Sequence, residues 1–127
     1  MSRLATQPTA HVAGRIETRP SRVDRFVAVV ELHGEHDLAT REAVRVALGS
    51  VRGDVLVDLS ECTFVGSTVI GTIVEAARSL AREGYRLELV LPPADSQVGK
   101  TLALVGLPDL LGSYDDLVSA DVDGAES

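Results

Sequence analysis

The chain has few aromatic residues and almost no cysteine. Phe, Trp and Tyr make up 3% of its 127 residues and Trp is absent, so a core has to be built from Val, Leu, Ile and Ala. The single cysteine, Cys62, has no partner for a disulfide within the chain, as expected for a reducing compartment. No apolar run approaches the roughly 18 residues needed to cross a membrane, and no secretory signal is recognisable. These absences predict a cytoplasmic location and no membrane partner.

Positive charge is also scarce. Asp and Glu number 19 against 12 Lys and Arg, so the formal net charge is −7. Because affinity for nucleic acid depends mainly on clustered Lys and Arg, this balance predicts that the chain does not bind nucleic acid.

The length and the 45% apolar content fit one domain with its own core. Residues 1–12 lack periodicity and residues 120–127 are small and acidic, so we expect a flexible N-terminal segment and a flexible acidic C-terminal tail. Residues 13–119 are then the domain. No internal repeat is present.

Apolar residues recur with the periods of alternating strands and helices. The expected strands cover residues 15–19, 26–32, 54–59, 85–91 and 110–111. One expected helix starts after a cap at Asp37 or Thr40 and ends at Gly49, and three more cover residues 67–83, 96–105 and 115–118. This order predicts an α/β fold in which a mainly parallel sheet lies behind an antiparallel hairpin. We expect a mixed central β-sheet of four to five strands and about four α-helices.

The segment between the third strand and the second helix carries the most specific pattern. It contains Asp58-Leu59-Ser60, then Phe64-Val65, then Gly66-Ser67-Thr68-Val69-Ile70-Gly71. This order resembles the signature of the STAS domain family (sulfate transporter and anti-sigma factor antagonist). Two further segments, residues 32–40 and 104–107, resemble other parts of the family pattern in the right order. The resemblance covers roughly residues 14–118 and implies the STAS fold.

The resemblance also implies a function. In bacterial anti-sigma factor antagonists a partner kinase phosphorylates the serine that corresponds to Ser67, so we expect a phosphoprotein that regulates sigma-factor-dependent transcription. Its partner would be an anti-sigma factor that is a serine kinase and supplies ATP and Mg²⁺, so the chain itself would need no cofactor and would be no enzyme. We expect a monomer or weak dimer. The expected partner-binding residues are Asp37, Thr40, Ser67, Thr68, Thr72, Glu75 and Arg78.

Two positions depart from the family pattern. Gly66 stands where the family usually has Asp, and Val69 stands where it usually has Gly. The alternative function is therefore a STAS scaffold without a phosphoswitch, or a sensor of a small anion at the start of the helix. Thr68 is the alternative modified residue, and either hydroxyl is also expected to cap the helix. If Gly66 has a positive φ, it is simply the turn residue.

Three other patterns are weaker. Residues 94–101 differ from the phosphate-binding G-x-x-x-x-G-K-[ST] loop at Ala94, and too little chain follows for an ATPase core. We therefore expect Lys100 on the exposed side of a helix whose Leu102 and Val105 pack inward. The segment from His33 to Asp37 lacks the ligand spacing of a zinc site, so no metal is assigned. All three histidines precede Ser67, which excludes the residue order of an α/β-hydrolase triad.

Overall fold

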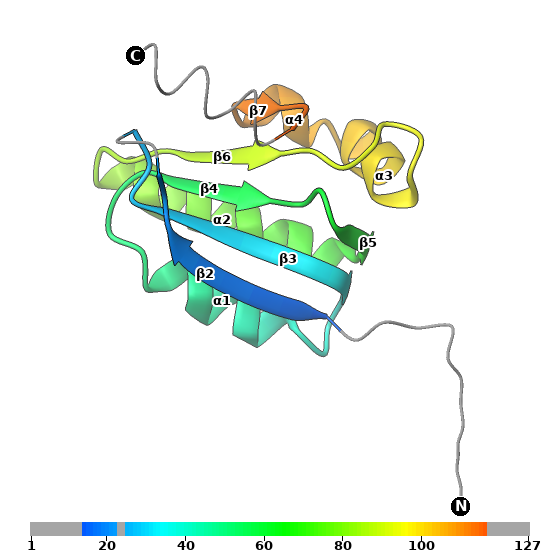
Figure 1. The fold of residues 1–127 in the computed structure, drawn as a ribbon, viewed down its shortest axis with the longest axis horizontal. Coiled ribbons are helices and arrows are strands. Elements are labelled where there is room, and N and C mark those ends of the chain that lie inside the picture. Colours follow the sequence, from blue (N-terminus) through cyan, green and yellow to red (C-terminus); the bar gives the residue numbers. More distant parts are fainter. Residues whose placement is uncertain (1–13, 23–24, 117–127) are drawn as a thin grey trace, which may run out of the picture.

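The computed structural model describes residues 14–22 and 25–116 (Figure 1). The expected flexible segments, residues 1–12 and 120–127, lie outside the described residues, as does the second half of the helix expected over 115–118. The strands are β2 (Arg15–Pro20), β3 (Ala28–His36), β4 (Val55–Asp58), β5 (Cys62–Val65), β6 (Leu87–Val90) and β7 (Ser113–Tyr114), and the helices are α1 (Arg41–Gly49), α2 (Ser67–Arg82), α3 (Gln97–Val105) and α4 (Leu107–Leu110).

The strands form one mixed sheet in the order β2-β3-β4-β6-β7, with β5 paired to β3. The hairpin of β2 and β3 is antiparallel, and every other pairing is parallel. This arrangement confirms the expected α/β fold class and the mainly parallel sheet behind a hairpin. The sheet also contains β5, for which the sequence pattern predicts no strand, so it has six strands where four to five were expected.

The long strand β3 explains why β5 exists. Its first half, from Ala28 to Glu31, pairs with β4, and its last part, from Gly34 to His36, pairs with β5. Between β4 and β5 the chain turns at Asp58, whose Oδ1 accepts hydrogen bonds from the amide of Ser60 (2.9 Å) and from its hydroxyl (2.7 Å). The Asp-Leu-Ser pattern therefore forms a turn that shifts the chain from one part of β3 to the next.

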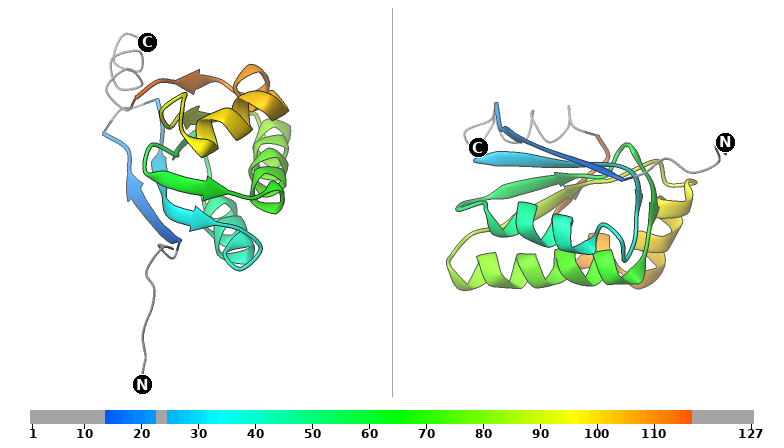
Figure 2. Two further views of the ribbon diagram at one scale, coloured as in Figure 1. Left: turned by 90° about the vertical axis from the view of Figure 1, so that its right-hand side faces the viewer. Right: turned by 90° about the horizontal axis from the view of Figure 1, so that it is seen from below.

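Helices α1 and α2 lie side by side against one face of the sheet (Figure 2). The core between these layers is aliphatic, as the composition predicts, because alternate residues of each strand point toward the helices. Its largest fully buried side chains include Leu32, Leu48, Leu59, Ile73 and Leu102.

The opposite face of the sheet has a second, smaller apolar cluster. Phe26, Val29, Leu56 and Val90 are buried there, with Tyr114 packed against them. Since Leu56 alternates with Val55 and Val57, the whole of β4 is buried on both faces, as its apolar run predicts.

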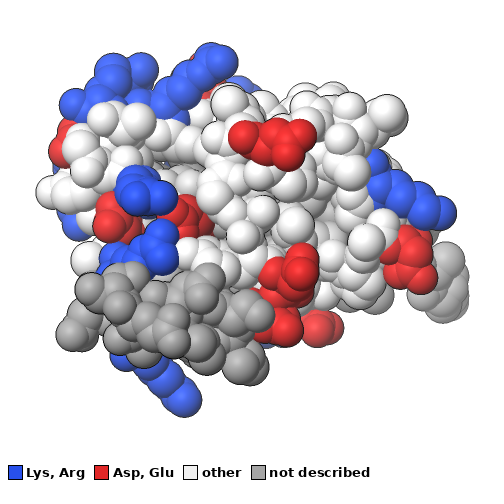
Figure 3. Space-filling view, turned by 90° about the horizontal axis from the view of Figure 1, so that it is seen from above, with Lys and Arg blue, Asp and Glu red and all other residues white. Residues whose placement is uncertain are grey.

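The C-terminal part of the fold differs most from expectation. Leu110 ends the short helix α4 instead of forming a strand, and the last strand is β7, which begins at Ser113. In α3, Leu102 packs inward as expected, but Val105 is 55% exposed and Leu104 is 88% exposed. The face that carries α3 and α4 is mostly uncharged at its centre (Figure 3).

Candidate functional site at the start of helix α2

The ends of β3 and β5 bring two distant segments of the chain together. The amide of Gly66 donates a 2.9 Å hydrogen bond to the carbonyl of His36, the last residue of β3. A Cβ atom placed on Gly66 would lie 3.6 Å from the Cα of Asp37 and 3.7 Å from its Cβ. Asp37 therefore lies beside the loop that leads to Ser67, as the resemblance implies, because neighbouring parallel strands end at the same edge of the sheet.

Helix α2 is capped by Gly66 and not by a hydroxyl. Gly66 has φ −91° and ψ 164°, and its carbonyl accepts hydrogen bonds from the amides of Val69 and Ile70, both at 3.1 Å. The expectation that Ser67 or Thr68 caps the helix is wrong: both residues already belong to the first turn. The reason is that β5 continues to Val65 and leaves only one residue for the cap.

Ser67 and Thr68 are exposed at the first two positions of the helix. Their amides have no acceptor among the residues that the structure describes, as is usual for the first turn of a helix. The aligned peptide dipoles give this end of α2 a partial positive charge. A phosphate on either hydroxyl would thus meet free amide donors and a favourable field.

Gly66 does not owe its place to backbone strain. Its φ of −91° is open to any residue, so the reading of Gly66 as a positive-φ turn residue is wrong. A Cβ atom there would make only ordinary contacts with Asp37 and Phe64. Aspartate would therefore fit this position sterically, close to Asp37.

The surface of α2 that follows the site differs from expectation at one position. Glu75 and Arg78 are exposed, but Thr72 is only 8% exposed and its hydroxyl donates a 2.9 Å hydrogen bond to the carbonyl of Thr68. Thr72 lies one turn beyond Thr68 and lines the space between α2 and α1, where little of its surface stays accessible. The expectation that Thr72 contributes an exposed binding group is wrong.

The turn between β3 and α1 is held by its own side chains. The amide of Ala39 donates to Oδ1 of Asp37 (2.9 Å), and the hydroxyl of Thr40 donates to the carbonyl of Asp37 (3.3 Å). Thr40 occupies the N-cap position of α1, yet its side chain makes no capping hydrogen bond because its hydroxyl also contacts Nδ1 of His36 at 3.0 Å. Asp37 itself is exposed, so its carboxylate is accessible at the site.

Comparison with known proteins identifies the family of this fold. A family model described as "Mlab, STAS domain" matches residues 22–112. The chain belongs to the STAS domain family. No curated protein sequence matches it with significance.

Solved structures share the STAS fold. An anti-sigma factor antagonist from Mycobacterium paratuberculosis superposes with a TM-score of 0.70 at 24% identity, covering 87% of this chain and 94% of that one. SpoIIAA, an anti-sigma factor antagonist solved in its unphosphorylated form, gives 0.65 at 21% identity with coverages of 91% and 99%. The phosphorylated form of SpoIIAA from Bacillus gives 0.59 at 20% identity, covering 87% and 99%.

Other sequence patterns of this STAS domain have structural explanations. The hydroxyl of Ser96 caps α3 by accepting the amide of Gly99 at 3.0 Å, and Lys100 is exposed as expected. His33 lies near Glu17 and Glu31 on the hairpin, where its Nε2 is 3.1 Å from Oε1 of Glu31. Arg19 on β2 also pairs with Glu31 on β3 at 2.9 Å, so the carboxylate of Glu31 has partners within the hairpin. No helix among the described residues is both long and apolar enough to span a membrane.

Sequence reasoning named Arg78 as a partner-binding residue but did not predict that five arginines line the space between α1 and α2. Arg41 and Arg45 lie four residues apart on α1, and Arg78 and Arg82 lie four residues apart on α2. This spacing places each pair on one side of its helix, so the pattern was available in the sequence. Only the packing of α1 beside α2 shows that both pairs border the same groove.

His36 is expected to make the stability of the protein depend on pH. Its side chain is 0% exposed, with Nε2 3.0 Å from the carbonyl of His33. Burial lowers the pKa of His36 below its usual value, and this effect outweighs the hydrogen bonds and the nearby Asp37 that favour the charged form. The folded protein therefore prefers neutral His36, which stabilises it fully above the unfolded pKa of about 6.5 and progressively less as the pH falls below it.

We expect the wild type to lose stability between about pH 7.5 and 5.5 and a His36→Gln variant to lose less over the same interval. Urea unfolding at each pH measures both slopes. Glu31, whose pKa is lowered by Arg19 and His33 against the effect of burial, adds its own loss only below about pH 4.5, outside this interval. Equal slopes for the two proteins would show that His36 does not carry the effect.

Proposed function

We propose that this STAS domain is an anti-sigma factor antagonist whose binding to an anti-sigma factor is switched by phosphorylation at Ser67. The anti-sigma factor would be a serine kinase, and its release of a sigma factor would regulate transcription in the bacterial cytoplasm. The observation that carries the proposal is the exposed hydroxyl of Ser67 at the first position of α2, beside Asp37 and free amides.

The switch would be electrostatic. A phosphate adds roughly −1.5 to −2 charge and three acceptor oxygens. The start of α2 tolerates that charge, whereas a partner surface that fits the unmodified hydroxyl would have to desolvate it. The likeness to SpoIIAA, which is known in unphosphorylated and phosphorylated forms, is consistent with such a switch. Thr68 is exposed one position later and is the alternative acceptor.

The partner surface would surround the start of α2. Asp37 and Thr40 border it from the β3–α1 turn, and Glu75 and Arg78 extend it along α2. Thr72 contributes little surface because it is only 8% exposed. The chain would act by binding and not by catalysis, with ATP and Mg²⁺ supplied by the kinase. We propose no cofactor or nucleic-acid partner, and a monomer or weak dimer in solution.

A second function is favoured by Gly66. Where the family usually has an aspartate, this loop has no side chain, so the carboxylate that would accompany the serine is missing. A STAS domain with this loop can serve as a scaffold that binds its partner without a phosphoswitch. The two functions predict the same partner surface, but a charge at Ser67 weakens binding if the switch operates and leaves it unchanged in the scaffold.

We expect Ser67→Glu to weaken binding of the anti-sigma factor at least about tenfold, or about 1.4 kcal/mol, because the added carboxylate imitates the phosphate charge. The partner is first captured from the source organism with the wild type, purified, and titrated by calorimetry. Mass spectrometry of residues 64–72 recovered from cells locates any phosphate.

Gln97→Glu is the matched control. Gln97 is the exposed first residue of α3, so the substitution places the same charge at the start of another helix. It should leave the affinity unchanged, and Ser67→Ala should retain binding. Equal affinities of Ser67→Glu and wild type, with an unmodified loop in cells, would reject the switch and favour the scaffold.

A further inference from the structure

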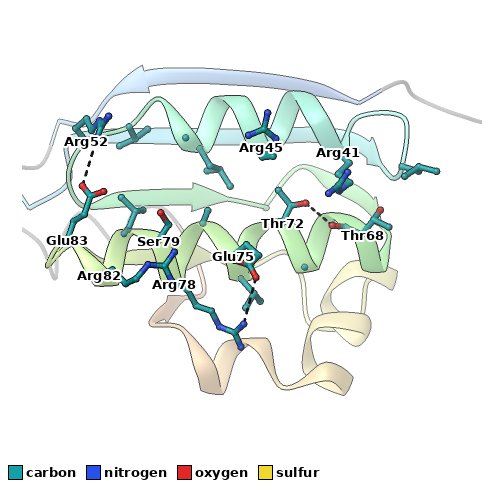
Figure 4. Close-up of a pocket in the computed structure, with 18 residues that line it drawn as sticks. Arg41, Arg45, Arg52, Thr68, Thr72, Glu75, Arg78, Ser79, Arg82 and Glu83 are labelled. Atoms are coloured by element: carbon teal, nitrogen blue, oxygen red, sulfur yellow. Dashed lines mark hydrogen bonds and ion pairs between the residues drawn. The ribbon is translucent and has the colours of Figure 1, made fainter.

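Helices α1 and α2 enclose a long groove on the side away from the sheet. Its volume is about 1050 Å³, and its walls run from Arg41 to Arg52 on the α1 side and from Thr68 to Glu83 on α2. Figure 4 shows Arg41, Arg45 and Arg52 along one side of the groove and Arg78 and Arg82 along the other. One end of the groove reaches Thr68, so it opens beside the candidate site.

The charge of this groove is opposite to that of the whole chain. Five arginines and two glutamates, Glu75 and Glu83, line it, and Arg45 also pairs with Glu42 on the same helix, which leaves an excess of two positive charges. The chain as a whole has a net charge of −7. A groove that gathers five of the 12 basic residues of an acidic protein is complementary to an anionic partner.

Most of these arginines are available to a partner. Arg41 and Arg82 are exposed and have no ion-pair partner within 4.0 Å among the residues that the structure describes. Arg52 lies 3.7 Å from Glu83 and Arg78 lies 3.9 Å from Glu75, both exposed pairs beyond hydrogen-bond distance. Exposed pairs of this kind are worth about 0–1 kcal/mol, so a partner carboxylate can replace them at little cost.

The lining between the arginines includes apolar side chains with accessible surface. Val74 and Ala76 are half-buried in the lining, and Leu38 is 72% exposed at one end. An occupant therefore needs an apolar face as well as negative charge. This combination distinguishes the groove from a site for a fully hydrated small anion.

The shape of the groove selects an extended occupant. The lining on α2 spans 15 residue steps from Thr68 to Glu83, which is roughly 22 Å at 1.5 Å per residue. The arginines are distributed along this length instead of converging on one point, as they would around a single phosphate. An amphipathic helix offers a narrow apolar stripe with charges on both sides over such a length.

We propose that the groove between α1 and α2 binds an acidic amphipathic helix of a partner protein, whose apolar stripe covers Leu38, Val74 and Ala76 and whose carboxylates pair with Arg41 and Arg82. The proposal deepens the proposed function by naming the chemistry of the partner, and it requires neither phosphorylation nor a kinase. It places a second contact surface next to the start of α2.

The test uses two fluorescein-labelled synthetic helices of about 18 residues with leucines at i, i+3, i+4 and i+7 spacing. One helix carries glutamates beside the leucine stripe, and the other carries lysines at the same positions. We expect the acidic helix to bind the full chain with a Kd below about 100 µM and more weakly at higher salt, and the basic helix not to bind. Fluorescence anisotropy measures the affinities, and amide chemical shifts locate the peptide.

Two double variants distinguish binding in the groove from a general effect of net charge. Arg41→Gln/Arg82→Gln should raise the Kd of the acidic helix at least about tenfold, while Arg15→Gln/Lys100→Gln, which removes two exposed charges outside the groove, should change it less than about twofold. All four positions are exposed, so both variants should unfold at the temperature of the wild type, as a thermal scan verifies.

Equal weakening by both double variants, shifts outside α1 and α2, or no binding of the acidic helix would overturn the proposal. Complete displacement of the acidic helix by about 10 mM inorganic phosphate would also overturn it, in favour of a small-anion site. The peptide assay contains no kinase, so a negative result in it does not contradict the Ser67 switch. Likewise, an unchanged partner affinity of Ser67→Glu does not contradict peptide binding in the groove.

Discussion

Gly99→Ala is expected to destabilise the protein by about 3 kcal/mol, at the upper end of the usual cost of overpacking. A Cβ atom on Gly99 would lie 2.2 Å from the carbonyl oxygen of Pro93, well inside contact distance. That oxygen cannot move freely because it accepts hydrogen bonds from the amide of Ser96 (3.0 Å) and from its hydroxyl (2.6 Å). Urea unfolding of the purified variant measures the loss.

Gly71→Ala is the matched control for this prediction. Gly71 also lies within a helix, but nothing is found within 4 Å of the position of its missing Cβ. Alanine there should stabilise the protein by about 0.5–1 kcal/mol, since glycine loses more backbone entropy on folding. If Gly99→Ala were as stable as wild type, the turn at Pro93 would be free to move and the glycine would not be required.

The second large effect is expected for Glu88→Ala, a loss of about 3 kcal/mol, because it removes one partner of a buried ion pair. Glu88 on β6 is only 2% exposed. Both its oxygens accept from Nη2 of Arg25 at 2.7 Å, and one of them lies 2.7 Å from Nη2 of Arg86. The hydroxyl of Tyr114 donates to Oε1 at 2.8 Å.

The cost arises from what remains after the carboxylate is removed. The side chain of Arg25 is 23% exposed, so its charge would stay partly desolvated without a partner. Burial, together with the hydrogen bond to Glu88, raises the pKa of Tyr114, so its hydroxyl stays protonated and would lose its acceptor.

Glu83→Ala is the control for Glu88→Ala. Glu83 is exposed and its pair with Arg52 spans 3.7 Å, so its removal should change stability by less than about 0.5 kcal/mol. Thermal and urea unfolding of both variants give the comparison. Similar small losses for the two would mean that Arg25 and Tyr114 find water when Glu88 is gone, and that the network does not hold β6 to β7.

The regions around Gly99 and Glu88 stabilise the fold that carries the candidate site. The glycine and lysine of residues 94–101 suggest a phosphate-binding loop, but the close approach of Gly99 to Pro93 gives the glycine a packing role at the start of α3. The Glu88 network lies on the face of the sheet away from α1 and α2 and ties β6 and β7 to Arg25. The sheet that carries the candidate site and the groove is therefore packed on both of its faces.

The candidate site was predictable in part. The period of Ile70, Ile73 and Ala77 marks the buried side of α2, and the order of the signature residues indicates where Ser67 lies. The cap was not predictable, because whether Gly66 or Ser67 precedes the first turn depends on how far β5 pairs with β3. Thr72 was misplaced for a related reason: a threonine suits the exposed and the inner side of a helix equally well when its hydroxyl reaches a carbonyl one turn back.

By itself the sequence determined the α/β class, the aliphatic core, the extent of α2 and the junction at which Ser67 is exposed. These features depend on local periodicity and on the types of residue, which are fixed before any long-range contact forms. The tertiary structure decided that β5 is a strand, that Glu88 is buried with Arg25 and Tyr114, and that the arginines of α1 and α2 border one groove. Each of these joins segments far apart in the chain, so it follows from the pairing of strands and the packing of helices, which no local pattern contains.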